Sequence, residues 1–86
     1  MNINDPELNR IRWQCRRGML ELDLLLNEFL ETVYPSLVPP VRQDFVRLLE
    51  QSDQTLQRWL LRDGSDVESD LLQIVQILRK QGIDRS

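Results

Sequence analysis

Apolar residues recur along this chain at spacings of three and four, which is the repeat of a helix with one buried face. The clearest such stretch ends at Tyr34-Pro35, because the residue before a proline is pushed out of the helical conformation. Acidic and amide side chains such as Asp23 and Asn27 fall on its other faces. This stretch predicts a helix with a broad buried stripe formed by Leu22, Leu25, Leu26, Phe29, Leu30 and Val33.

Four shorter segments carry stripes of the same kind, one before this helix and three after it. No run of alternating apolar and polar residues bounded by turn dipeptides competes with them, so no strand is expected. The positions predicted to face the core are Leu8, Ile11 and Cys15 in the first helix, Val41, Phe45, Leu48 and Leu49 in the third, Leu56, Trp59 and Leu60 in the fourth, and Val67, Leu71, Ile74, Val75 and Leu78 in the fifth.

Proline and glycine mark the expected ends of the first helices. Asp5-Pro6-Glu7 opens the first helix with a capping side chain, a proline at the first helical position and an acid near the positive end of the dipole. Gly18 interrupts the pattern and is expected to end this helix or form a tight turn. If it is only a terminator, it should have positive φ. Val38-Pro39-Pro40 is expected to start the third helix. Proline is tolerated there because the first N–H groups of a helix have no partner within the helix.

Side chains mark the ends of the last two helices. Ser52 or Asp53 is expected to cap the fourth, which stops near residues 63–64. Ser65 and Glu68 have the spacing of a capping box and predict the start of the fifth helix. Gly82 is expected to follow that helix.

The predicted fold is all-α, a small compact five-helix bundle. Links of about two to five residues between the segments favour antiparallel neighbours. A chain of 86 residues is enough for one domain. We expect residues 1–86 to form a single helical domain, with a core over about residues 5–80 and a short flexible C-terminal tail.

Composition excludes most catalytic chemistry. The chain has no histidine, so it lacks the usual general base and the commonest metal ligand. Its single cysteine, Cys15, has no internal disulfide partner and is expected to be a small core residue rather than a nucleophile. We therefore expect no catalytic residue, no metal site and no enzyme activity.

Charge and hydropathy indicate a cytoplasmic protein that binds another protein. A net charge of −3 disfavours nucleic-acid binding through phosphates. The N-terminus lacks the basic start and apolar run of a signal peptide, and no apolar segment approaches the ~20 residues that span a bilayer. A basic segment, residues 10–17, is followed by an acidic one, residues 21–31, an arrangement suited to orienting a protein partner.

Trp13 lies on the face of the first helix opposite its core stripe. At 100° per residue, Arg10, Trp13 and Arg17 lie about 140–200° from Leu8. A tryptophan flanked by these two arginines has the composition of an interaction hot spot. Packing of Trp13 on a neighbouring helix is an equally good reading, since a terminal helix can be buried on two sides.

Arg17-Gly18-x-x-Glu21 stands where the first helix gives way to the second. The simplest reading is structural: Gly18 ends a helix, and Arg17 and Glu21 suit the negative end of one dipole and the positive end of the next. The functional reading is that Gly18 lets another backbone approach closely while the flanking charges fix its orientation. The spacing alone favours the structural reading.

Longer stretches resemble a known family, the flavin assembly factors of succinate dehydrogenase, SdhE-like in bacteria and called assembly factor 2 in mitochondria. The resemblance includes the family's Arg-Gly-x-x-Glu motif and keeps order and spacing over roughly residues 10–61. The opening of the third helix departs from the Ser or Asp cap that members often have there. The stretches that carry the resemblance are Arg10–Asp23, Phe45-x-x-Leu48-Leu49-Glu50 and Asp53-x-x-Leu56-x-x-Trp59-Leu60.

The resemblance implies a chaperone-like assembly factor rather than a catalyst. Such a factor binds the flavoprotein subunit of succinate dehydrogenase, and of fumarate reductase where present, and promotes covalent attachment of FAD to a histidine of that subunit. FAD then belongs to the partner, and the factor is expected to bind no cofactor stably. It is also expected to be a monomer that neither binds nucleic acid nor inserts into membranes. The residues expected to bind the partner are Arg10, Trp13, Arg16, Arg17, Gly18 and Glu21.

The resemblance also suggests how the motif acts. Arg17 would pair with a partner carboxylate or backbone carbonyls, Gly18 would permit close approach, and Glu21 would fix the turn or meet a partner cation. Arg17 and Glu21 are taken as exposed charges of small weight in folding. The alternatives are an unrelated helical protein-interaction adaptor and a small DNA-binding regulator, whose affinity for DNA would fall steeply with salt.

Overall fold

Five α-helices follow one another along residues 6–85, which are the residues that the computed structural model describes. Three short helical turns accompany them: η1 (Tyr34–Ser36), η2 (Gln57–Leu61) and η3 (Ser69–Leu71). No strand occurs among these residues, so the predicted all-α, five-helix fold is confirmed. In chain order the helices are α1 (Pro6–Gln14), α2 (Leu20–Thr32), α3 (Pro39–Leu48), α4 (Asp53–Leu56) and α5 (Leu72–Arg85).

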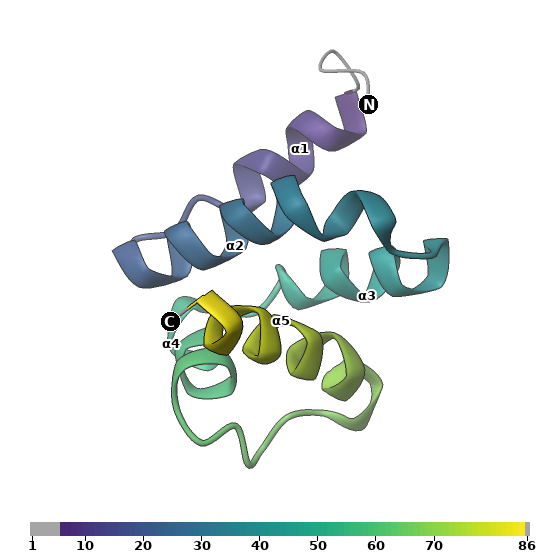
Figure 1. Ribbon diagram of the computed structural model, residues 1–86. Coiled ribbons are helices and arrows are strands. Elements are labelled where there is room, and N and C mark those ends of the chain that lie inside the picture. The colour runs from purple at the N-terminus through teal and green to yellow at the C-terminus, as the bar shows by residue number, and fades with distance from the viewer. Residues whose placement is uncertain (1–5, 86) are drawn as a thin grey trace.

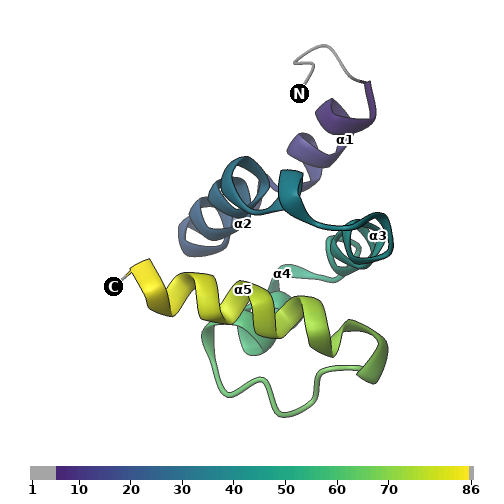
Figure 2. The ribbon, with the colours of Figure 1, turned by 45° about the vertical axis from the view of Figure 1, so that its right-hand side comes forward.

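The centre of the bundle is formed by α2, α3 and α5. Helix α5 packs against both α2 and α3, while α1 stands at one end of the molecule, beside α2 (Figure 1). In the turned view α5 crosses beneath α2 and α3, and the link between η2 and η3 lies at the end opposite α1 (Figure 2). The radius of gyration, 12.1 Å, is what a compact chain of this length should have.

The predicted stripes meet in one core. Its centre is aromatic: the rings of Phe29 and Phe45 lie 5.0 Å apart and those of Tyr34 and Phe45 5.6 Å apart, in tilted arrangements favourable to aromatic pairs. Val33, Val41 and Val67 are only partly buried against this core. The buried residues are Leu8, Ile11, Cys15, Leu22, Leu25, Leu26, Phe29, Leu30, Tyr34, Phe45, Leu48, Leu49, Leu56, Trp59, Leu60, Leu71, Ile74, Val75 and Leu78.

Several predicted helix ends are confirmed. Helix α3 starts with proline after an extended Val38, and α4 has Ser52 as its cap, whose Oγ accepts from the Thr55 N–H at 3.1 Å. Helix α2 ends at Thr32, just before the short turn η1. The predicted cap of the first helix, Asp5, lies outside the described residues.

Two predictions about α5 are wrong. Ser65 does not cap it: its N–H and Oγ both contact the Asp63 carboxylate, a local bond that competes with capping. Glu68 precedes η3 without a side-chain cap bond, and α5 begins only at Leu72. Gly82 does not end the helix, which continues to Arg85, because a glycine costs a helix only about 1 kcal/mol.

Candidate partner-binding site

The link between α1 and α2 carries the motif. Helix α1 ends where the Cys15 N–H donates to the Ile11 carbonyl at 3.0 Å. Asn27 of α2 then holds the end of this turn, since its Nδ2 donates to the Cys15 carbonyl at 3.3 Å and to Asp23 Oδ1 at 2.6 Å. The link is therefore tied to the middle of α2 just before Arg17.

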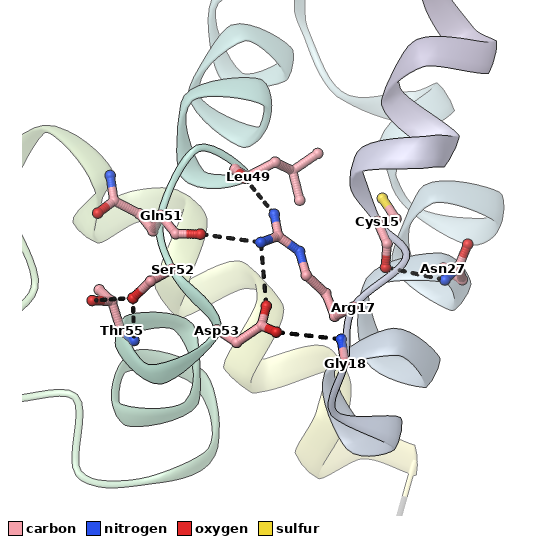
Figure 3. Close-up of polar contacts among 9 residues, drawn as sticks. All are labelled: Cys15, Arg17, Gly18, Asn27, Leu49, Gln51, Ser52, Asp53 and Thr55. Atoms are coloured by element: carbon pink, nitrogen blue, oxygen red, sulfur yellow. Dashed lines mark hydrogen bonds and ion pairs between the residues drawn. The ribbon is translucent and has the colours of Figure 1, made fainter.

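The Arg17 side chain crosses from this link to the one between α3 and α4 (Figure 3). Its Nη2 donates to the Leu49 carbonyl, and its Nη1 donates to the Gln51 carbonyl at 3.1 Å and to Asp53 Oδ1 at 3.3 Å. These residues, together with Gly18, are called the Arg17 cluster below. The last carbonyls of a helix have no partner within it, and Arg17 supplies donors where α3 ends.

The expectation that Arg17 is an exposed charge is therefore wrong. Its side chain is only 13% exposed, because the acceptors it meets belong to its own chain, 32–36 residues further on. From local spacing, Arg17 was predicted to interact with the C-terminal end of the first helix. In the structure it meets the C-terminal end of α3 instead, because α3 packs beside the α1–α2 link. Arg17 therefore connects the α1–α2 link to the α3–α4 link by hydrogen bonds.

Gly18 is exposed, and it differs from the expected terminator. Among the described residues positive φ occurs at Gly64 (φ 65°) and not at Gly18, so Gly18 is not a positive-φ helix terminator. The Gly18 N–H donates to Asp53 Oδ2 at 3.3 Å. A Cβ added at Gly18 would lie 3.4 Å from the same oxygen, an ordinary contact. The fold itself leaves room for a side chain here.

Glu21 is exposed in the first turn of α2, beside an apolar surface that was not predicted from the sequence. Leu20 is 72% exposed, Leu24 57% and Leu61 38%. Met19, Leu20, Glu21, Gln57 and Leu61 line a shallow hollow of about 230 Å³. The signal available in the sequence was that Leu20 and Leu24 fall outside the core stripe of their helix.

Trp13 is exposed on the outer face of α1, with 70% of its surface in solvent, so its burial against another helix is excluded. The guanidinium of Arg16 lies over its ring, 5.2 Å from the centroid, while Arg17 turns away into its own cluster. The prediction that Arg17 shares the exposed face of Trp13 is wrong, because α1 ends at Gln14 and the Arg17 side chain is only 13% exposed. Arg10 is exposed on the same helix, and Asn9, Arg12, Trp13 and Arg16 line a hollow of about 260 Å³.

The chemistry of the one thiol is that of a core residue. Cys15 is fully buried, and burial raises its pKa from 9.0 to about 12, although Arg17 and Arg12 nearby act in the opposite direction. A neutral thiol is neither a nucleophile nor a metal ligand. Within the described part of the chain no cluster of three or more metal-ligating side chains occurs, and no helix is long and apolar enough to cross a membrane.

Comparison with known proteins identifies the family. Residues 9–81 match the family described as "Flavinator of succinate dehydrogenase". The chain belongs to this family. It is 43% identical over 72 residues to the FAD assembly factor SdhE of Yersinia pseudotuberculosis, covering 84% of this chain and 82% of the relative. It is 41% identical over 76 residues to that of Pseudomonas putida, covering 88% and 90%.

The part of the chain that matches the flavinator family contains every surface described above. Residues 9–81 include both hollows and the whole Arg17 cluster. The relative from Pseudomonas aeruginosa, also named FAD assembly factor SdhE, is 40% identical over 75 residues and covers 87% of this chain. The family match therefore concerns the bundle as a whole and not an isolated motif.

Proposed function

We propose that this protein is an assembly factor that binds the flavoprotein subunit of succinate dehydrogenase, and of fumarate reductase where a cell has one, and promotes its covalent attachment to FAD. The observation that carries the proposal is membership of the flavinator family over residues 9–81. Relatives that are 40–43% identical over most of their length are named FAD assembly factors. The all-helical bundle, with exposed surfaces on both sides of the α1–α2 link, is suited to binding another protein.

The surface proposed to meet the flavoprotein lies on the exposed residues of the motif. Gly18 and Glu21 face solvent, and the exposed leucines 20, 24 and 61 adjoin them. Exposed apolar area next to a charged rim is the usual composition of a protein interface. Trp13, with Arg10 and Arg16, is a second contact on α1, where a large aromatic side chain in solvent is suited to burial by a partner.

The role of Arg17 in this proposal is indirect. Its guanidinium donates to three acceptors of its own chain, so it orders the link that presents Gly18 and Glu21. A rigid link lowers the cost of binding, because fewer side chains and backbone torsions have to be ordered in the complex.

The factor is proposed to supply binding energy and no reacting group. Preferential binding to one arrangement of the flavoprotein's domains raises the population of that arrangement, in which the flavin and the histidine can react. In this proposal FAD stays with the flavoprotein, and the factor is a cytoplasmic monomer that does not bind nucleic acid. The buried, neutral Cys15 and the absence of histidine from the sequence support this division of roles.

The test is flavin attachment with purified components. The flavoprotein subunit is incubated with FAD and increasing concentrations of the factor, and covalent flavin is read as in-gel fluorescence. We expect wild-type factor to raise the yield and Glu21→Ala to require more factor for the same yield. Glu68→Ala, which removes another exposed glutamate at a helix start, is the matched control and should behave as wild type.

Two results would count against the proposal. A yield that is the same with and without wild-type factor would refute the assembly function. Equal losses in Glu21→Ala and Glu68→Ala would show that total charge matters and not the α1–α2 link.

A further inference from the structure

Asp53 connects the two links that meet beside Gly18. It is the first residue of α4, and its two carboxylate oxygens have different partners (Figure 3). Oδ1 accepts from Arg17 Nη1 at 3.3 Å, and Oδ2 accepts from the Gly18 N–H at 3.3 Å. One carboxylate, with 29% of its side chain exposed, thus holds two successive residues of the α1–α2 link.

Capping of α4 does not need this carboxylate. Ser52 is the cap: its Oγ accepts from the Thr55 N–H at 3.1 Å and lies 3.0 Å from Thr55 Oγ1. Asp53 is stabilised at the positive end of the α4 dipole, and the helix fixes its backbone. Its contact with Gly18 is therefore a separate feature and not a by-product of capping.

Arg17 and Asp53 contribute to the cluster in different ways. Without Asp53, Arg17 would still donate to the carbonyls of Leu49 and Gln51. The Gly18 N–H, in contrast, donates to Asp53, and Gly18 is exposed, so water would replace the carboxylate there. Loss of Asp53 should loosen Gly18 and the turn that follows while the tie between the links remains.

We propose that Asp53 is a positioning residue for partner binding: it holds Gly18, and through it the turn up to Glu21, in the arrangement that the flavoprotein binds. This inference rests on the proposed function, which supplies the partner. The physical basis is conformational selection. If the segment adopts the binding-competent arrangement for only a fraction of the time, the apparent affinity is the intrinsic affinity multiplied by that fraction.

The experiment compares Asp53→Ala and Asp53→Asn with wild type. The matched control is Asp70→Ala, which also removes an acid in the first turn of a helix, paired with Arg47 at 3.7 Å. Each variant is first checked for folding by circular dichroism and thermal melting. Flavin yield is then measured against factor concentration, and the Gly18 amide resonance of the free factor is recorded by NMR.

For Asp53→Ala we expect the concentration giving half-maximal yield to rise about tenfold, with an unchanged plateau, because a charge-assisted hydrogen bond shifts a local equilibrium by about that factor. The Gly18 amide proton should move upfield in the free protein. For Asp53→Asn the half-maximal concentration should lie between those of wild type and Asp53→Ala. Arg17 and Gly18 donate to different carboxylate oxygens, and the amide replaces one of these oxygens with an NH2 group, which does not accept. Asp70→Ala should match wild type in both measurements.

The outcomes separate this inference from the proposed function. A wild-type factor without effect on the yield refutes the function before any variant is compared. A folded Asp53→Ala with a wild-type midpoint overturns the positioning role alone, and so does a shifted midpoint with an unmoved Gly18 resonance. If Asp53→Ala does not fold, Asp53→Asn decides: an intermediate midpoint supports the role, and a wild-type midpoint overturns it.

Discussion

Two turns of this molecule each combine an arginine with a glycine, and they use the glycine in opposite ways. At the first, Arg17 reaches the carbonyls where α3 ends, and Gly18 lies beside it. At the second, Arg79 of α5 donates to the carbonyls of Trp59 and Arg62, at 2.8 and 2.7 Å, where η2 ends, and Gly64 lies beside it.

The arginines perform the same task. In both turns a guanidinium from a distant segment supplies donors to carbonyls that a helix end leaves without a partner. A planar group with several N–H donors can bond to more than one carbonyl at once, which a lysine does less well. Each arginine therefore fastens a chain reversal to the bundle.

The glycines differ in what the fold demands. Gly64 has φ 65°, and a Cβ there would lie 3.0 Å from the Trp59 carbonyl oxygen and 3.1 Å from Arg79 Nη1. Gly18 lacks positive φ and has space for a Cβ. Folding therefore requires glycine at 64 and not at 18. A functional requirement for glycine at 18 would have to come from a molecule that approaches it.

The largest effect is expected from removing an arginine. Arg17→Ala should lower the free energy of unfolding by roughly 2–4 kcal/mol, because the Leu49 and Gln51 carbonyls and Asp53 Oδ1 lose their Arg17 donors. Urea denaturation measures the change. Arg16→Ala is the control, an exposed arginine for which less than about 1 kcal/mol is expected. Equal midpoints for the two variants would contradict the structural role of Arg17.

The second effect is expected at Gly64. Gly64→Ala should lower the free energy of unfolding by about 1–3 kcal/mol, since alanine disfavours positive φ and its Cβ would crowd the Trp59 carbonyl. Thermal melting measures this, and flavin yield per folded molecule should be unchanged. A Gly64→Ala protein as stable as wild type would mean that this turn tolerates a side chain as Gly18 does.

A smaller effect on stability is expected at Gly18. Gly18→Ala should change the free energy of unfolding by less than about 1 kcal/mol, and a gain is possible because alanine restricts the unfolded chain. Gly18→Arg should stay folded and yet lose flavin yield, as its side chain would occupy the space left for the partner. A fall in melting temperature as large as that of Gly64→Ala would remove the contrast between the two turns.

The smallest effect on stability at neutral pH is expected from the ionisation of Cys15, which lies next to the first of these two turns. Its pKa is raised from 9.0 to about 12 in the folded protein, so above pH 9 the unfolded chain loses this proton first. The stability contributed by the neutral thiol is complete below pH 9 and falls by about 1.4 kcal/mol per pH unit from there toward pH 12. Urea denaturation from pH 8 to 11 should show a steeper loss for wild type than for Cys15→Ala; parallel curves would mean that the thiol is solvated.

The sequence by itself determined the features that depend on residues close to one another along the chain. Helical periodicity identified the segments and nearly all buried positions, because a residue and those three or four further on share a helix face. Pro39 and Ser52 marked helix starts correctly, because their effects reach no further than one turn. The longer stretches around Arg17-Gly18-x-x-Glu21 were enough to identify the family that the comparison confirmed.

The tertiary structure decided what the motif residues do. Arg17 meets carbonyls more than 30 residues away only because α3 packs where it does, and no local rule predicts which helix end that will be. The assignment of positive φ to Gly64 instead of Gly18 likewise depends on how the chain must turn to bring α5 back onto the bundle. Exposure of Trp13 and Leu20 was decided by the lack of a neighbouring helix over those faces. Interactions between residues close in sequence determine where the helices form. Packing between distant segments determines which helices contact one another and which side chains stay exposed for binding.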